Sequence, residues 1–160
     1  MTGPSALMRT LDELDPPPWG EPEFDSHLVT TCHRLRRKPI GEFTVEDLRR
    51  MIGQGIGLRW LVPRALEALE QDPLSEGDLY PGDLLASVLR IPADFWSREP
   101  ESRDRVEAVL EHLSDSREEV NDAVEVFRAR PNAPLERPGA WAPVDSRGGW
   151  SAPAAQRPCS

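Results

Sequence analysis

The sequence predicts an all-α protein: a compact bundle of about six to seven short helices with a disordered, proline-rich C-terminal tail. Two observations favour the bundle. Apolar residues recur three and four positions apart up to residue 128, and no segment alternates apolar and polar residues as a half-buried strand does. A third observation concerns the tail, where prolines, glycines, alanines and serines replace the apolar pattern. We therefore expect a helical domain over residues 1–130 and a disordered tail over residues 131–160.

The first two helices are predicted on either side of a proline run. Residues 5–14 form the first helix, which the prolines at 16–18 end. The second begins near Asp25 or Ser26, either of which can cap free backbone N–H groups, and ends before Pro39. Their apolar stripes consist of Leu7, Leu11 and Leu14 in the first helix, and of Leu28, Val29, Cys32 and Leu35 in the second.

The next two helices flank a glycine-rich segment. Thr44 is expected to cap the third helix together with Asp47, while Phe43 and Leu48 stand at the positions of a hydrophobic staple. The fourth helix covers residues 58–71 and tolerates Pro63 provided that this proline lies in the first turn. The apolar faces consist of Leu48, Met51 and Ile52 in the third helix, and of Leu58, Leu61, Val62, Ala65, Leu66 and Leu69 in the fourth.

A polar loop over residues 75–81 leads to the last helices. The fifth ends before Pro92 and is followed by a short turn over residues 93–97; the sixth covers about residues 101–113 and the seventh residues 116–128. Short connections between amphipathic helices indicate a bundle. The apolar faces consist of Leu84, Leu85, Val88 and Leu89, then of Val106, Val109, Leu110 and Leu113, and finally of Val120, Val124 and Phe127.

Composition narrows the class of protein. No apolar run approaches the roughly 18 residues of a membrane span, and the N-terminus lacks a signal-peptide pattern, so we expect a cytoplasmic protein without a membrane partner. The formal net charge of −9 argues against direct nucleic-acid binding, which depends on Lys and Arg, and favours a basic partner. Cys32 and Cys159 lie far apart in the sequence and imply no disulfide framework.

No motif predicts catalysis, a cofactor or a metal. The glycines at 53, 55 and 57 follow a predicted helix rather than a strand, so we interpret them as a turn between helices instead of a nucleotide loop. His27, Cys32 and His33 do not share one helix face, as zinc ligands four residues apart would, and His112 is distant in sequence. No Gly-x-Ser-x-Gly motif marks a nucleophile. We expect a protein that is not an enzyme.

Charge patterning offers one candidate site. Six acidic residues fall within 17 positions without an intervening basic residue: Glu67, Glu70, Asp72, Glu76, Asp78 and Asp83. They fit either a solvated face or a docking surface for a basic protein, because opposed potentials speed encounter and fix orientation. Trp60 and Tyr80, near in sequence, belong to residue types favoured as interface anchors, and core positions fit them equally well.

Two other features come into consideration as possible binding sites. The basic residues at the end of the second helix, Arg34, Arg36, Arg37 and Lys38, complement the negative end of the helix dipole. Trp141 and Trp150 are the aromatic residues of the predicted tail, and they are either anchors for a partner or incidental.

A series of phrases spans much of the chain: SHLVTTCHRLRRKP at 26–39, FTVEDLRRMIGQ at 43–54, LVPRALE at 61–67 and DPLSEGDLYPGDLL at 72–85. In this order they resemble a family of immunity proteins of contact-dependent growth inhibition systems, over about Leu11 to Trp96. The resemblance implies a small cytoplasmic bacterial protein, not an enzyme, that binds and occludes a toxin domain delivered by a neighbouring cell, often a nuclease. It carries over no catalytic or binding residue.

The residues and the resemblance together predict an immunity protein that neutralises its toxin by stoichiometric occlusion. A nuclease must hold an anionic backbone, so an acidic inhibitor can place carboxylates where phosphates would bind. Slow dissociation additionally requires a buried apolar or aromatic anchor. The alternative prediction is an acidic helical adaptor that binds a cellular protein.

Overall fold

The computed structural model of the protein describes residues 4–23, 26–114 and 116–130. Within these residues the chain forms nine α-helices and one 3-10 helix and no strand, apart from an isolated bridge between Thr10 and Pro39, so the all-α prediction is confirmed. The predicted tail, with Trp141 and Trp150, lies outside the described residues. The helices are α1 (Pro4–Leu7), α2 (Leu11–Leu14), α3 (His27–Arg36), η1 (Ile40–Glu42), α4 (Val45–Gly53), α5 (Leu58–Gln71), α6 (Asp83–Leu89), α7 (Ala93–Arg98), α8 (Pro100–Glu111) and α9 (Glu118–Ala129).

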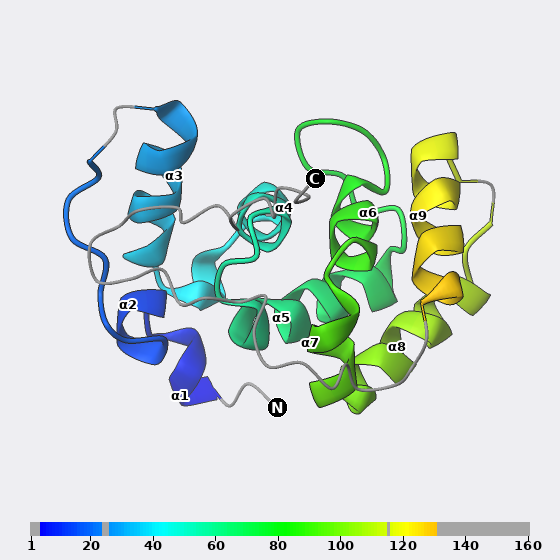
Figure 1. Ribbon diagram of the computed structural model, residues 1–160, viewed down its shortest axis with the longest axis horizontal. Coiled ribbons are helices and arrows are strands. Elements are labelled where there is room, and N and C mark those ends of the chain that lie inside the picture. The colour runs from blue at the N-terminus through cyan, green and yellow to red at the C-terminus, as the bar shows by residue number, and fades with distance from the viewer. Residues whose placement is uncertain (1–3, 24–25, 115, 131–160) are drawn as a thin grey trace, which may run out of the picture.

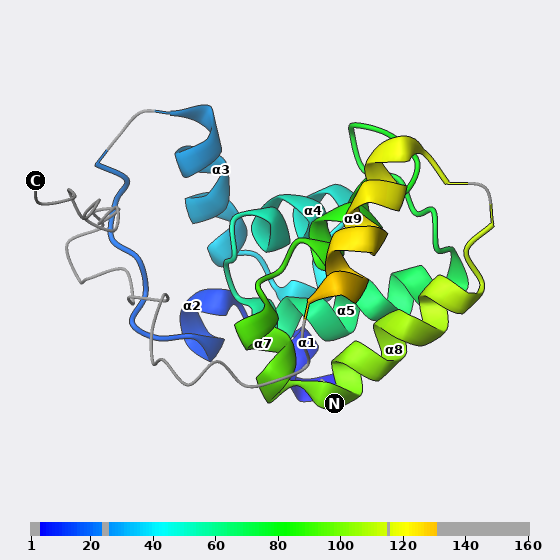
Figure 2. The ribbon, with the colours of Figure 1, turned by 45° about the vertical axis from the view of Figure 1, so that its right-hand side comes forward.

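The helices are arranged along the long axis of the molecule. Helix α3 lies at one end, α8 and α9 lie at the other, and α4 and α5 lie between them (Figures 1 and 2). The core follows this order, because α4 packs on both α5 and α6, and α9 packs on α6. Among the described residues, no helix is long and apolar enough to cross a membrane.

The predicted first helix is divided into α1 and α2. Thr10 adopts an extended conformation between them, and its N–H donates to the Glu13 carboxylate at 2.7 Å. The carbonyl of Arg9 accepts a hydrogen bond from the N–H of Ile40 at 3.0 Å, which ties the break to η1. The sequence prediction missed the break because the leucine spacing continues across it, whereas the partner at Ile40 is distant in sequence.

The predicted start of α4 is confirmed. The Thr44 hydroxyl accepts from the N–H of Asp47 at 3.2 Å, and the Asp47 carboxylate accepts from the N–H of Thr44 at 3.0 Å. Helix α5 has the predicted bounds and begins after Gly57, whose φ of 63° lies in the left-handed region. Pro63 is the sixth residue of α5 and not part of its first turn, so the helix gives up one backbone hydrogen bond there.

Helix α9 completes the core at the far end. Its Phe127 is fully buried and meets the ring of Trp96 edge to face, with ring centroids 5.5 Å apart. The guanidinium of Arg103 lies 4.9 Å from the centroid of Phe127, and Arg130 donates to the carbonyl of Ile91 at 2.5 Å. The predicted seventh helix is therefore an integral part of the fold.

Arg36 of α3 links this helix to α2 and to the segment that follows α2. Its side chain is only 2% exposed, and its Nε donates to the Asp12 carboxylate at 2.8 Å. The same guanidinium donates to the carbonyl of Asp15 at 2.8 Å and lies 4.6 Å from the ring centroid of Trp19. The dipole explanation for this basic helix end is therefore incomplete, since Arg36 is a buried link between α2 and α3.

Candidate partner-binding surface

The structure divides the acidic cluster into two groups. Glu67 pairs with Arg64 on α5, and Glu70 receives two hydrogen bonds from Arg105 on α8, at 2.6 and 3.0 Å. The second pair lowers the pKa of Glu70 and raises that of Arg105, chiefly through these hydrogen bonds. Both carboxylates are exposed but already face an arginine of the same chain.

The second group belongs to residues 72–82, which we call the α5–α6 loop. The loop projects between α4 and α9 (Figure 1). Its ends are joined by a hydrogen bond from the N–H of Gly82 to the carbonyl of Leu74, at 3.0 Å. The exposed Asp72 turns its carboxylate back to accept from the N–H of Leu74, also at 3.0 Å. The loop is thus a closed, internally bonded segment.

Asp83 lies beneath this loop and not on its outer side. The residue is only 2% exposed, and its carboxylate accepts from the N–H groups of Gly77 at 2.7 Å and Leu79 at 3.1 Å. Arg49 of α4 lies 3.6 Å from the same carboxylate. This burial corrects the expectation that Asp83 faces solvent with the other acids: its charge is used to shape the loop.

Glu46, a residue of α4, fastens the loop to this helix. Its carboxylate pairs with Arg49, at 2.6 Å, and with Arg50, and accepts from the N–H of Asp78 at 2.9 Å. The hydrogen bond from Arg49 is the largest reason why the pKa of Glu46 falls from its ordinary 4.5 to about 2. The i, i+3 and i, i+4 spacing of these residues signals the ion pairs in the sequence, but nothing there signals the bond to Asp78.

The outer side of the loop carries the exposed residues. Asp78 has a side chain 64% exposed that reaches Arg50 only at 3.4 Å, and the exposed Glu76 carboxylate has no hydrogen bond or ion pair with any described residue. Leu79, the residue after Asp78, is an apolar residue in this group and is 61% exposed. Sequence reasoning missed Leu79, although a leucine inside a polar loop is a recognisable signal.

The two aromatic candidates are half-buried. Trp60 packs against the core from α5 and lies under the guanidinium of Arg59, 5.5 Å from its ring centroid. Tyr80 also packs against the core, and Arg117 lies 5.9 Å from its ring centroid. Tyr80 is next to Leu79 in the loop, whereas Trp60 belongs to the first turn of α5.

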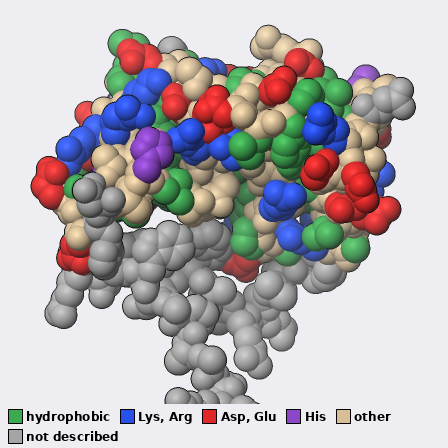
Figure 3. Space-filling view, turned by 90° about the horizontal axis from the view of Figure 1, so that it is seen from above, with side chains coloured by type: hydrophobic (Ala, Val, Ile, Leu, Met, Phe, Trp, Pro, Cys, Tyr) green, Lys and Arg blue, Asp and Glu red, His purple; other side chains and the backbone are tan. Residues whose placement is uncertain are grey.

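The face seen from above carries both signs of charge. Acidic and basic side chains lie next to one another there, with hydrophobic side chains exposed between them (Figure 3). The described residues on this face therefore do not form one uniform acidic patch.

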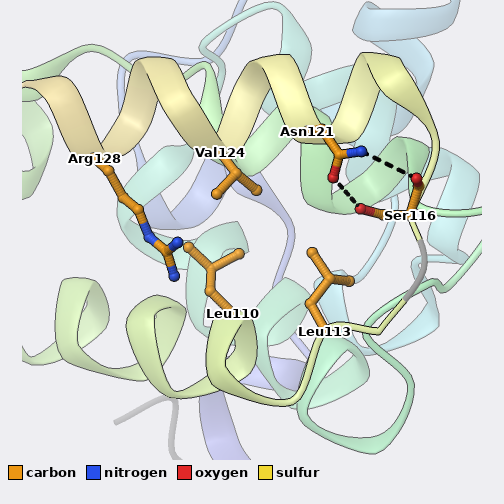
Figure 4. A pocket seen from close by; sticks show the side chains of 6 residues that line it. All are labelled: Leu110, Leu113, Ser116, Asn121, Val124 and Arg128. Carbon is orange, nitrogen blue, oxygen red and sulfur yellow. Dashed lines mark hydrogen bonds between the residues drawn. The ribbon is translucent and has the colours of Figure 1, made fainter.

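A groove of about 360 Å³ separates α8 from α9 (Figure 4). Its polar side chains already have partners: Ser116 and Asn121 hydrogen-bond each other at 2.5 Å, and Arg128 lies 3.9 Å from Glu107. The apolar side chains on its walls are those of Leu110, Leu113 and Val124. Nothing in this lining resembles the convergent polar groups of a small-molecule site.

Cysteine and histidine show no shared site among the described residues. Cys32 is buried in the core, and this burial raises the pKa of its thiol. His33 lies against Trp19, with ring centroids 5.0 Å apart. Within the described parts of the chain, no three His, Cys, Asp or Glu side chains gather as a metal site would need.

The described residues thus form an all-helical domain whose α5–α6 loop exposes acidic side chains and one leucine. The chain belongs to the family described as CDI immunity proteins, whose model matches residues 13–106, well over half of its length. The match contains α3 to α7 and the whole α5–α6 loop, and it ends before α9. No curated protein matches the chain.

Proposed function

We propose that this protein binds the toxin domain of its own growth-inhibition system and neutralises it by stoichiometric occlusion, without turning over a substrate. Membership of the CDI immunity family carries this proposal. The structure supports it with an ordered loop whose outer side exposes Glu76, Asp78 and Leu79.

We further propose that the toxin is a nuclease. Such an enzyme binds an anionic backbone through lysine and arginine, so its cleft attracts an acidic protein. The formal net charge of −9 provides this attraction. Of the acidic candidates, Asp72, Glu76 and Asp78 extend from one loop, whereas Glu67 and Glu70 face arginines on α5 and α8.

Co-expression tests the function directly. We expect the reading frame immediately upstream of this chain's gene to encode a C-terminal toxin domain, and this domain is expressed in a susceptible bacterium, with and without the chain. We expect growth to be rescued by this chain and not by an unrelated immunity protein produced at the same level. Continued growth arrest in the presence of the folded chain would contradict the proposal, and would favour an adaptor that binds a cellular protein.

A titration of the purified toxin domain tests the mechanism. Nuclease activity on RNA and DNA is followed while the chain is added, and it should fall linearly to zero at one equivalent. An endpoint far below one equivalent would indicate that the chain acts catalytically, which would contradict occlusion. A toxin domain that kills cells without cleaving either nucleic acid would remove the nuclease proposal alone.

A further inference from the structure

We propose that the α5–α6 loop is the main recognition element of this protein, and that Leu79 inserts into an apolar socket of the toxin rimmed by lysine or arginine. This inference rests on the proposed function, since it names the part of the chain that touches the toxin. It commits to one partner chemistry: an apolar depression surrounded by positive charge on a protein surface.

The exposure of Leu79 is the first observation. A large apolar side chain that remains in water on an ordered loop can be buried by a partner without unfolding anything, and removing its apolar surface from water favours association. Leu79 is 61% exposed although its own N–H is tied down by the buried Asp83. The backbone is thus anchored at the residue whose side chain points outward.

The rigidity of the loop is the second observation. Four backbone N–H groups within it donate to carboxylates or carbonyls of defined position: those of Gly77 and Leu79 to Asp83, that of Asp78 to Glu46, and that of Gly82 to Leu74. A loop that is already ordered loses little conformational entropy on binding, so more of the interaction energy appears as affinity.

The space around Gly77 shows how closely the loop fits its support. A Cβ atom at this position would meet the Glu46 carboxylate and would lie 3.0 Å from the Asp83 carboxylate. Both carboxylates are held by Arg49, so neither can move away freely. A larger residue at this position would therefore force the Glu46 side chain or the loop to shift.

Charge complementarity defines the partner. Glu76 and Asp78 are exposed on the same short loop as Leu79, and the Asp78 carboxylate pairs only with Arg50 among the described residues, at 3.4 Å. A toxin surface with lysine or arginine around an apolar depression would satisfy the carboxylates and bury the leucine together. Rim charges of this kind guide association, while the apolar anchor slows dissociation.

Leu79→Ala tests the anchor. With the purified toxin domain from the upstream reading frame, we expect Kd to rise at least about tenfold, mainly through faster dissociation, as for a truncated interface anchor. Met8→Ala is the matched control, because Met8 is 79% exposed and lies beside α1, far along the chain from the loop. Its Kd should stay within about twofold of the unmodified protein.

Gly77→Ala tests the rigidity of the loop without removing any side chain from the proposed contact. We expect this variant to weaken binding as well, since its Cβ would crowd the Glu46 and Asp83 carboxylates that hold the loop. Urea denaturation of every variant establishes that the domain still folds. Unchanged affinity in Leu79→Ala would overturn the anchor, and unchanged affinity in Gly77→Ala would overturn the preordered loop.

The two levels of proposal fail differently. If the unmodified chain neither binds nor rescues cells from the toxin domain, the proposed function is wrong. If the unmodified chain binds and Leu79→Ala binds equally well, the function stands and the recognition element lies elsewhere on the surface.

Discussion

At the scale of single residues, buried charges hold segments that the apolar pattern cannot position. Arg36 is the clearest case, since its guanidinium bonds the side chain of Asp12 and the carbonyl of Asp15 and stacks near Trp19. A planar group with several donors suits this task, and a lysine could not replace it. The segment from α2 to Trp19 therefore depends on one side chain of α3.

Replacing this arginine should loosen the N-terminal segment. Arg36→Met leaves the Asp12 carboxylate without its main partner, and we expect the free energy of unfolding to fall by about 3 kcal/mol, as when one member of a buried ion pair is removed. Urea denaturation measures the loss. Arg34→Met, at an exposed position of the same helix, is the control and should change stability by less than about 0.5 kcal/mol.

Glu46 predicts a dependence of stability on pH. Because its pKa falls from 4.5 to about 2 on folding, its contribution is complete above pH 4.5 and is lost as the pH falls toward 2. Glu46→Gln should lower the free energy of unfolding at pH 7 by about 2 kcal/mol, the value of a charged hydrogen-bonded group. It should also flatten the profile between pH 4.5 and 2.

Urea midpoints measured across this pH range check the prediction. Glu76→Gln is the matched control, since the Glu76 carboxylate is exposed and has no partner among the described residues. A variant at Glu46 with the same acid sensitivity as the unmodified protein would assign that sensitivity to other carboxylates.

Residue-scale features differed in how far the sequence could predict them. The Thr44–Asp47 cap and the burial of Cys32 are confirmed predictions, because each follows from spacing within one helix. The link from Arg36 was not predicted, since its partners lie 21 to 25 positions away. The same holds for Asp83, which looks like any other acid until the fold places loop N–H groups around it.

At the scale of helices, the spacing of apolar residues predicted that a helix exists better than it predicted where the helix begins, breaks or ends. The leucine stripe over residues 5–14 continues through Thr10, so the break between α1 and α2 depends on pairing with residues near Pro39. Pro63 likewise lies beyond the first turn of α5, where core packing of its neighbours Leu61 and Val62 outweighs one missing hydrogen bond. Tertiary contacts decided both outcomes.

Helix α9 lies beyond the part of the chain matched by the family, yet it belongs to the core. Phe127 is fully buried against Trp96, so Phe127→Ala should lower the free energy of unfolding by about 3–5 kcal/mol, as expected for a large cavity. Val126→Ala, at a half-exposed position of the same helix, is the control. Equal urea midpoints for the two variants would mean that the domain folds without α9.

At the scale of the whole molecule, net charge and local charge make separable contributions to binding. The chain carries a formal net charge of −9, but arginines of its own neutralise Glu67, Glu70 and Asp83. A partner is therefore attracted at long range by the electric field of the whole chain. Its orientation on the surface depends on the few carboxylates that remain exposed. Sequence alone gives the first of these and not the second.

Two charge reversals of equal size distinguish these contributions. Glu76→Lys with Asp78→Lys changes the net charge by the same amount as Asp122→Lys with Glu125→Lys, an exposed pair on α9. Both variants should associate more slowly with the toxin, because their negative net charge is smaller. The loop variant should be about tenfold slower still at low salt, because its reversed charges meet the basic rim of the toxin.

Stopped-flow association at about 20 and 200 mM salt measures both contributions, since added salt screens the charges and shortens the distance over which they act. The difference between the two variants should shrink as salt rises and the field is screened. Asp83 is left unchanged in both variants because its buried carboxylate holds the loop N–H groups. Equal rates for the two variants would mean that only the net charge guides the toxin, and that it approaches without regard to the α5–α6 loop.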